Sequence, residues 1–88
     1  MKKGVDNMDK VVAILARLGV DYRFEDGEVI IDDIGGTIYE LNGEIGFIYG
    51  NTEPSVSVNS PLLEKWVEAY IEGNEVFGSF LRSQKKVA

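Results

Sequence analysis

The sequence predicts an α+β fold: an antiparallel β-meander of three to five strands with an N-terminal helix, a C-terminal helix and a short terminal helical segment. Two amphipathic helical patterns flank residues 21–58, and Asp-Gly and Asn-Gly turn signals lie between alternating apolar residues in that stretch. The length of 88 residues corresponds to one domain covering 1–88. We expect the ends, residues 1–5 and 83–88, to be mobile.

The first helix is predicted to run through DKVVAILARL, with Asp6 or Asn7 as its N-terminal cap. Its apolar residues recur at three- and four-residue steps and form one stripe: Met8, Val11, Val12, Leu15 and Leu18. Gly19 can adopt the left-handed conformation that ends a helix, while Val20 folds back on the last turn.

The stretch Val29–Gly50 is predicted to form the centre of the sheet. Asn42-Gly43 between alternating apolar residues is a strong signal for a two-residue hairpin turn. Such a turn pairs Leu41 with Glu44, Tyr39 with Gly46, and Ile38 with Phe47.

A second hairpin is predicted around Asp26-Gly27, which suits a type I′ turn. A two-residue loop places Phe24 opposite Val29 and Tyr22 opposite Ile31, giving one apolar face. Because the same register sets Glu25 against Glu28, a longer, bulged loop is an open alternative.

The central hairpin divides its side chains between two faces. One face is assigned to the core: Ile38, Ile45, Phe47 and Tyr49. The other holds Thr37, Tyr39, Leu41 and Ile48, and on it Tyr39 can lie across the bare backbone of Gly46. Because this second face is too apolar to be left fully solvated, we expect the C-terminal segment or a partner to cover it.

The C-terminal third is predicted to contain an edge strand at Ser55–Val58 and a helix opened by Ser60-Pro61. Gly73-Asn74 ends that helix. The spacing of Val76, Phe77, Phe80 and Leu81 predicts a further short helical segment, which either docks on the sheet or joins a dimer.

The charge is acidic and unevenly distributed. The formal net charge is −6, and residues 25–64 hold nine acidic residues and no Lys or Arg. Such a stretch repels phosphates, which argues against direct binding of nucleic acid and favours a basic partner or simple solubility.

Catalytic and cofactor signatures are absent from the sequence. It has no His and no Cys, the commonest sources of general bases, nucleophiles and metal ligands. Asp32-Asp33 lacks the alternating spacing of a calcium loop, so we interpret it as a solvated turn. We therefore predict no enzyme activity, no metal and no cofactor.

One helix carries a resemblance to a known family. The segment NSPLLEKWVEAYIEG, Asn59–Gly73, resembles the helix after the sheet in small acidic phage-encoded anti-CRISPR inhibitors. The chain length and the helix–sheet–helix order are also similar to those of that family. The resemblance implies a DNA mimic that blocks a basic nucleic-acid-binding cleft. The residues after this helix, Glu75–Phe80, are largely apolar, whereas that family carries a dense acidic run there.

We therefore predict a non-enzymatic binding or inhibitory protein for a basic, nucleic-acid-handling protein partner. The alternative is a small self-associating scaffold or structural protein that uses its edge strand or its apolar sheet face, for example as a homodimer. With no bilayer-length apolar run and no signal peptide, we expect it in the cytoplasm of a bacterium or of a virus-infected host cell. The candidate partner-binding residues are Glu25, Asp26, Glu28, Asp32, Asp33, Tyr39, Glu40, Glu44 and Glu53.

Overall fold

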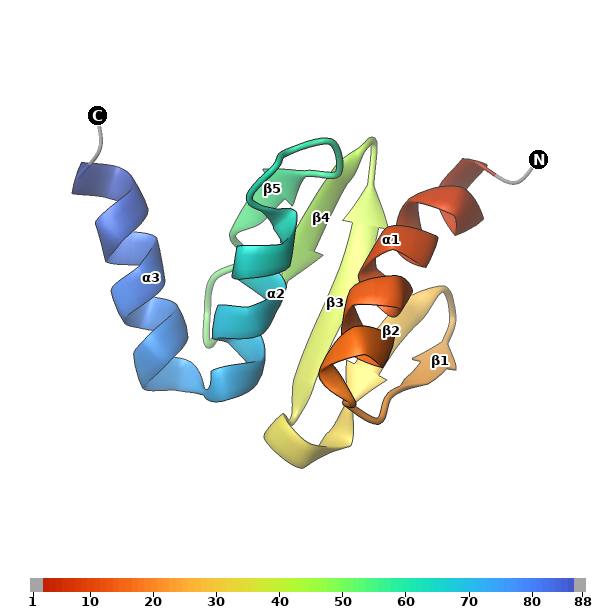
Figure 1. The fold of residues 1–88 in the computed structure, drawn as a ribbon, viewed down its shortest axis with the longest axis horizontal. Helices are drawn as coiled ribbons and strands as arrows, with labels where there is room; N and C mark the ends of the chain where they lie inside the picture. Colours follow the sequence, from red (N-terminus) through yellow and green to blue (C-terminus); the bar gives the residue numbers. More distant parts are fainter. Residues whose placement is uncertain (1–2, 87–88) are drawn as a thin grey trace.

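The computed structural model describes residues 3–86 of the chain, with side chains for residues 8–84. Its elements confirm the predicted α+β class (Figure 1). In chain order they are α1 (Lys3–Leu18), β1 (Arg23–Glu25), β2 (Glu28–Ile31), the 3₁₀ turn η1 (Asp32–Ile34), β3 (Gly36–Leu41), β4 (Glu44–Phe47), β5 (Ser55–Ser57), α2 (Leu63–Glu72) and α3 (Asn74–Lys86).

The sheet is an antiparallel meander in which each strand pairs with the next, in the order β1-β2-β3-β4-β5. Both predicted two-residue hairpins are confirmed. The turn residues Asp26-Gly27 and Asn42-Gly43 all have positive φ, as a type I′ turn requires. Phe24 lies opposite Val29 and Glu25 lies opposite Glu28, so the bulged alternative for the first hairpin does not occur.

Helix α1 begins at Lys3, so the predicted cap at Asp6 or Asn7 was wrong. An acidic residue in the first turn of a helix is favoured by the macrodipole as well, and this signal therefore does not fix the first residue. The predicted end is confirmed. Gly19 has φ 71°, and the Val20 N–H donates to the Leu15 carbonyl at 3.0 Å.

Helix α2 begins at Leu63, so the predicted start at Ser60-Pro61 was two residues early. The Ser60 hydroxyl accepts a hydrogen bond from the Leu62 N–H at 3.0 Å. This hydrogen bond stabilises a turn that precedes the helix and does not cap the helix. Helix α3 spans 13 residues and is longer than the apolar pattern indicated. Both α1 and α3 extend into the ranges expected to be mobile, and that mobility stays a prediction.

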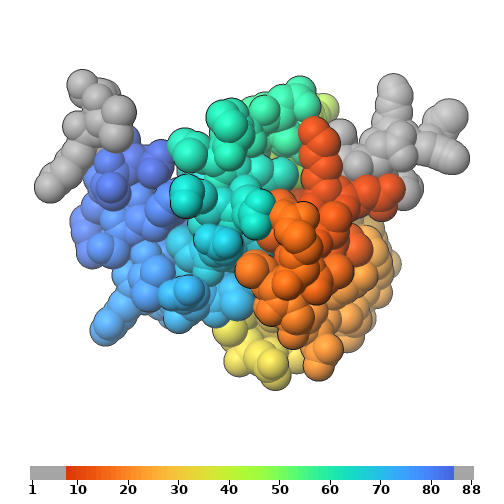
Figure 2. Space-filling view, viewed as in Figure 1, coloured from red at the N-terminus to blue at the C-terminus, as the bar shows by residue number. Residues whose placement is uncertain are grey.

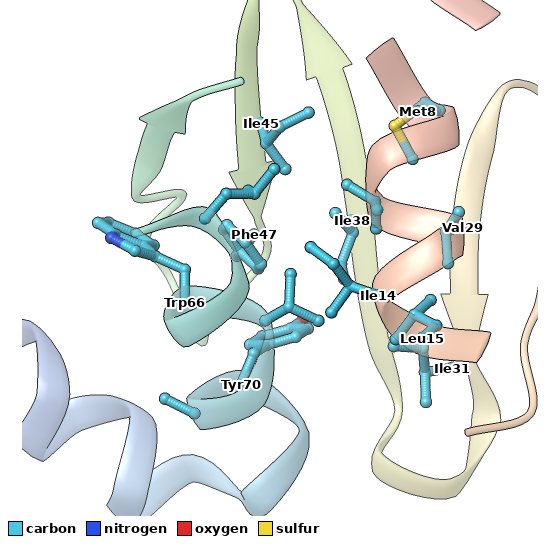
Figure 3. Packing of buried hydrophobic residues seen from close by; sticks show 14 of the residues in the cluster. Met8, Ile14, Leu15, Val29, Ile31, Ile38, Ile45, Phe47, Trp66 and Tyr70 are labelled. Carbon is cyan, nitrogen blue, oxygen red and sulfur yellow. The ribbon is translucent and has the colours of Figure 1, made fainter. Parts of the chain in front are cut away.

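The core lies between the sheet and the helices. Figure 2 shows α1, α2 and α3 forming most of one side of the molecule, with β3 and β4 largely hidden behind them. Side chains from α1, the central strands and α2 converge in this layer (Figure 3). The largest fully buried side chains are Phe47, Phe77, Leu15, Ile31, Ile38, Ile45, Val11, Val29 and Val67.

The edge strand β1 lies outside this cover. Val29 and Ile31 are buried, whereas Phe24 on the same face is 53% exposed. Tyr22 packs edge-on against Phe24, with ring centroids 6.0 Å apart, and is also exposed. The apolar face expected for this hairpin is therefore buried on one strand only.

Candidate functional site

The side of the sheet turned away from the helices is the candidate site, and we call it the open face. Alternation along the strands, together with the observed registers, determines which side chains lie on the open face. These are Arg23, Glu25, Glu28, Ile30, Thr37, Tyr39, Leu41, Glu44, Gly46, Ile48, Ser55 and Ser57.

No helix in residues 3–86 covers the open face. Helix α3 packs against α2, and its Phe77 is fully buried in the core against Phe47 and Tyr70. The C-terminal segment therefore does not supply the cover that the sequence left open. Leu41 stays 61% exposed and Ile48 40% exposed.

Tyr39 crosses the open face as predicted. A Cβ atom at Gly46 would overlap the Tyr39 ring, so only glycine lets the ring lie flat on the strand backbone. The Tyr39 hydroxyl donates to Glu53 Oε1 at 2.7 Å. That hydrogen bond, with smaller contributions from burial and from the charges of Glu53 and Glu28, raises the pKa of Tyr39.

One cation compensates part of the acidic charge. Arg23 makes two hydrogen bonds to Asp32, from Nε at 2.9 Å and Nη2 at 3.2 Å, and a third from Nη1 to Glu25 at 3.1 Å. The hydrogen bond from Arg23 holds the pKa of Asp32 below its ordinary value, and the two carboxylates raise the pKa of Arg23. Asp32 lies in η1, at the border of the open face.

Three carboxylates on or bordering the open face have no cationic partner within the described part of the chain: Glu28, Glu44 and Glu53. Glu44 accepts a hydrogen bond from the Ser55 hydroxyl at 3.0 Å, which fixes one of its oxygens. These carboxylates carry the uncompensated negative charge of this surface.

The remaining predicted site residues lie elsewhere. Asp26 is in the β1–β2 turn and Asp33 is in η1, and both are exposed. Glu40 lies opposite Ile45 on the helix-covered face, where its Oε2 accepts a hydrogen bond from the Gly43 N–H at 2.8 Å. The structure thus brings together Glu25, Glu28, Tyr39, Glu44 and Glu53, with Asp32 beside them.

Arg23 belongs to the candidate site but was not among the residues predicted from the sequence. It stands just before the all-acidic stretch, and its partner Asp32 is nine residues away. A signal was available, because Arg23 and Glu25 are two residues apart on one strand and therefore share a face.

Among the described residues, no group of three or more His, Cys, Asp or Glu could hold a metal ion. None of the helices within residues 3–86 is long and apolar enough to cross a membrane. Comparisons with protein families, curated proteins and solved structures gave no match.

Proposed function

We propose that this chain is a non-enzymatic binding or inhibitory protein whose open face docks on a basic surface of a nucleic-acid-handling protein. The observation that carries the proposal is the uncovered sheet face. It combines exposed apolar side chains with carboxylates that lack a cation among the described residues. Binding there would bury Leu41 and Ile48 and would neutralise Glu28, Glu44 and Glu53.

The density of carboxylates on the open face can be compared with the density of phosphates on duplex DNA. Five strands about 4.8 Å apart span about 19 Å, a length over which duplex DNA carries about eleven charges. The open face and its border offer the carboxylates of Glu25, Glu28, Asp32, Glu44 and Glu53, of which Glu25 and Asp32 are already paired with Arg23. We therefore favour recognition of a basic protein surface through charge and apolar contact together. Charge-for-charge imitation of DNA, as in the anti-CRISPR type of inhibitor, is the narrower form of the proposal.

The test is a pull-down from bacterial lysate at low and at high salt, followed by mass spectrometry. The triple variant E28Q/E44Q/E53Q should lose the captured partner, and high salt should release it from the unmodified protein, because exposed charges are screened. The matched control D9N/D33N/E72Q removes the same charge from exposed positions off the open face and should retain the partner. Equal loss in both variants, or capture that is insensitive to salt, would contradict the proposal.

Self-association is a second candidate, favoured by the two free sheet edges. Strands β1 and β5 each pair on one side only, and every residue of β1 is exposed. Two open faces would repel each other through their carboxylates, so a dimer would form through an edge strand. Light scattering at increasing protein concentration decides this, since a strict monomer at millimolar concentration is incompatible with the scaffold function.

A further inference from the structure

A hollow in the open face has the chemistry of a side-chain pocket. Its volume is ≈ 260 Å³, which is enough for a guanidinium group and its neighbouring methylenes. It lies between the β3–β4 hairpin and the loop before β5. Its walls include Tyr39, Leu41, Glu44, Gly46, Glu53 and Ser55.

Each wall of the hollow offers a different contact. One face of the Tyr39 ring lies against Gly46, so the opposite face is turned away from the sheet. Glu53 uses one oxygen for the Tyr39 hydroxyl and Glu44 uses one for the Ser55 hydroxyl. The second oxygen of each carboxylate has no partner among the described residues, and Leu41 supplies an exposed aliphatic wall.

We propose that this hollow receives an arginine side chain of the partner protein. The idea rests on the proposed function and names the group that the open face recognises. A planar guanidinium can stack on the outward face of Tyr39 while it donates hydrogen bonds to the free oxygens of Glu44 and Glu53. Its methylenes pack on Leu41. Charge complementarity thus selects a cation, and the aromatic ring selects arginine over lysine.

The arginine comes from outside the chain. Within residues 8–84, Arg23 is the cation on the open face, and its nitrogens are held by Asp32 and Glu25. Arg17 pairs with Glu64 at 2.7 Å on the helix-covered side. With a formal net charge of −6, the protein attracts cations from solution.

The test is an NMR titration of the ¹⁵N-labelled full chain with a blocked Gly-Gly-Arg-Gly-Gly peptide. Matched peptides carry lysine or the neutral isostere citrulline in place of arginine. We expect the amide shifts to concentrate at Tyr39, Gly46 and Ser55. The arginine peptide should bind about two- to fivefold more tightly than the lysine peptide, and the citrulline peptide should produce no shifts there.

Variants assign the contacts. E44Q and E53Q should each weaken binding by about two- to fivefold, and D33N, which removes a charge outside the hollow, should leave it unchanged. Y39L should abolish the preference for arginine over lysine, whereas Y39F should keep it. If the ¹⁵N spectrum shows that Y39L is unfolded, the contacts are judged from the E44Q and E53Q variants alone.

Two results would overturn the arginine pocket. Equal binding of the lysine and arginine peptides at these amides removes the arginine assignment and leaves a general cation-binding open face, as the proposed function requires. Absence of shifts at the hollow with every peptide also removes it. The pull-down with E28Q/E44Q/E53Q then decides separately whether the open face binds a basic protein.

Discussion

The hydroxyl of Tyr70 accepts a hydrogen bond from the backbone N–H of Thr37 at 3.0 Å. It also donates to the Ile48 carbonyl at 2.5 Å. The direct backbone hydrogen bond between these two residues is donated by the Ile48 N–H to the Thr37 carbonyl, so the Thr37 N–H and the Ile48 carbonyl do not pair with each other. A side chain of α2 therefore joins two strands where their own ladder is incomplete. Gly36 leaves room for it, because a Cβ atom there would lie 2.8 Å from the Tyr70 oxygen.

Replacing Tyr70 with Phe should destabilise the protein by about 1–3 kcal/mol, because a partly buried N–H and a carbonyl lose their partner. Urea denaturation of Y70F against the unmodified protein measures this difference. Y22F is the matched control, since the described structure gives the exposed Tyr22 hydroxyl no hydrogen bond. Equal stability of Y70F and the unmodified protein would show that water replaces the hydroxyl at no cost.

The same tyrosine predicts a loss of stability in alkali. Burial raises the pKa of Tyr70, although the hydrogen bond from Thr37 acts in the opposite direction. The folded state therefore holds this proton more tightly than the unfolded state, whose tyrosine ionises near pH 10. Its contribution is complete below about pH 10 and is lost as the pH rises through the higher folded pKa. The stability gap between the unmodified protein and Y70F should shrink as the pH rises above about 10 in urea titrations.

Gly78 in α3 predicts a coupled pair of substitutions. Glycine inside a helix costs about 1 kcal/mol relative to Ala, so G78A would ordinarily stabilise. Here a Cβ atom would lie 2.5 Å from the Tyr49 oxygen, which donates to the Asn74 carbonyl at 3.1 Å. We expect G78A to fall short of the full gain in the unmodified protein and to reach it in a Y49F background. Thermal or urea unfolding of the four proteins in this cycle measures the coupling, and additivity would contradict the contact.

The Arg23–Asp32 pair predicts an acid-side effect. An NMR titration should place the Asp32 pKa below the ordinary aspartate value of about 3.9 in the unmodified protein and return it there in R23Q. Since the ionised form is favoured on folding, the contribution of the pair is complete above about pH 4. It is lost as the pH falls through the lowered pKa. E25Q should leave the Asp32 pKa low, because the hydrogen bond between Arg23 and Asp32 is its main cause.

Much of the fold could be predicted because its signals are local. Asn42-Gly43 and Asp26-Gly27 take the positive φ angles that fix both hairpin registers, so the β1–β2 and β3–β4 pairings follow from two dipeptides. The length of α3 could not be predicted in the same way. Gly78 argues against a helix by propensity, and the reason for its presence is Tyr49, 29 residues earlier in the chain.

The candidate site was predictable only in part. Alternation placed Tyr39 and Glu44 on one face, and the same rule places Glu40 on the other, with Ile38. The pairing of Arg23 with Asp32 depends on a 3₁₀ turn that brings the carboxylate back beside β1. Such a turn has no residue signature in Asp32-Asp33, so the neutralisation of Asp32 was not visible in the sequence.

The strand order of the meander has a consequence for how the chain folds. Because every strand pairs with its immediate neighbour, the whole sheet forms through short loops whose closure costs little entropy. The distant closures that remain include those that join α1 to β3 and to α2, and α2 to β3 through Tyr70 and Thr37. We therefore expect rapid refolding, on a timescale of about milliseconds, limited by pairing of the strands, with α1 docking after this step. In stopped-flow refolding, substitutions in the Asn42-Gly43 turn should slow folding, whereas V11A in α1 should mainly speed unfolding.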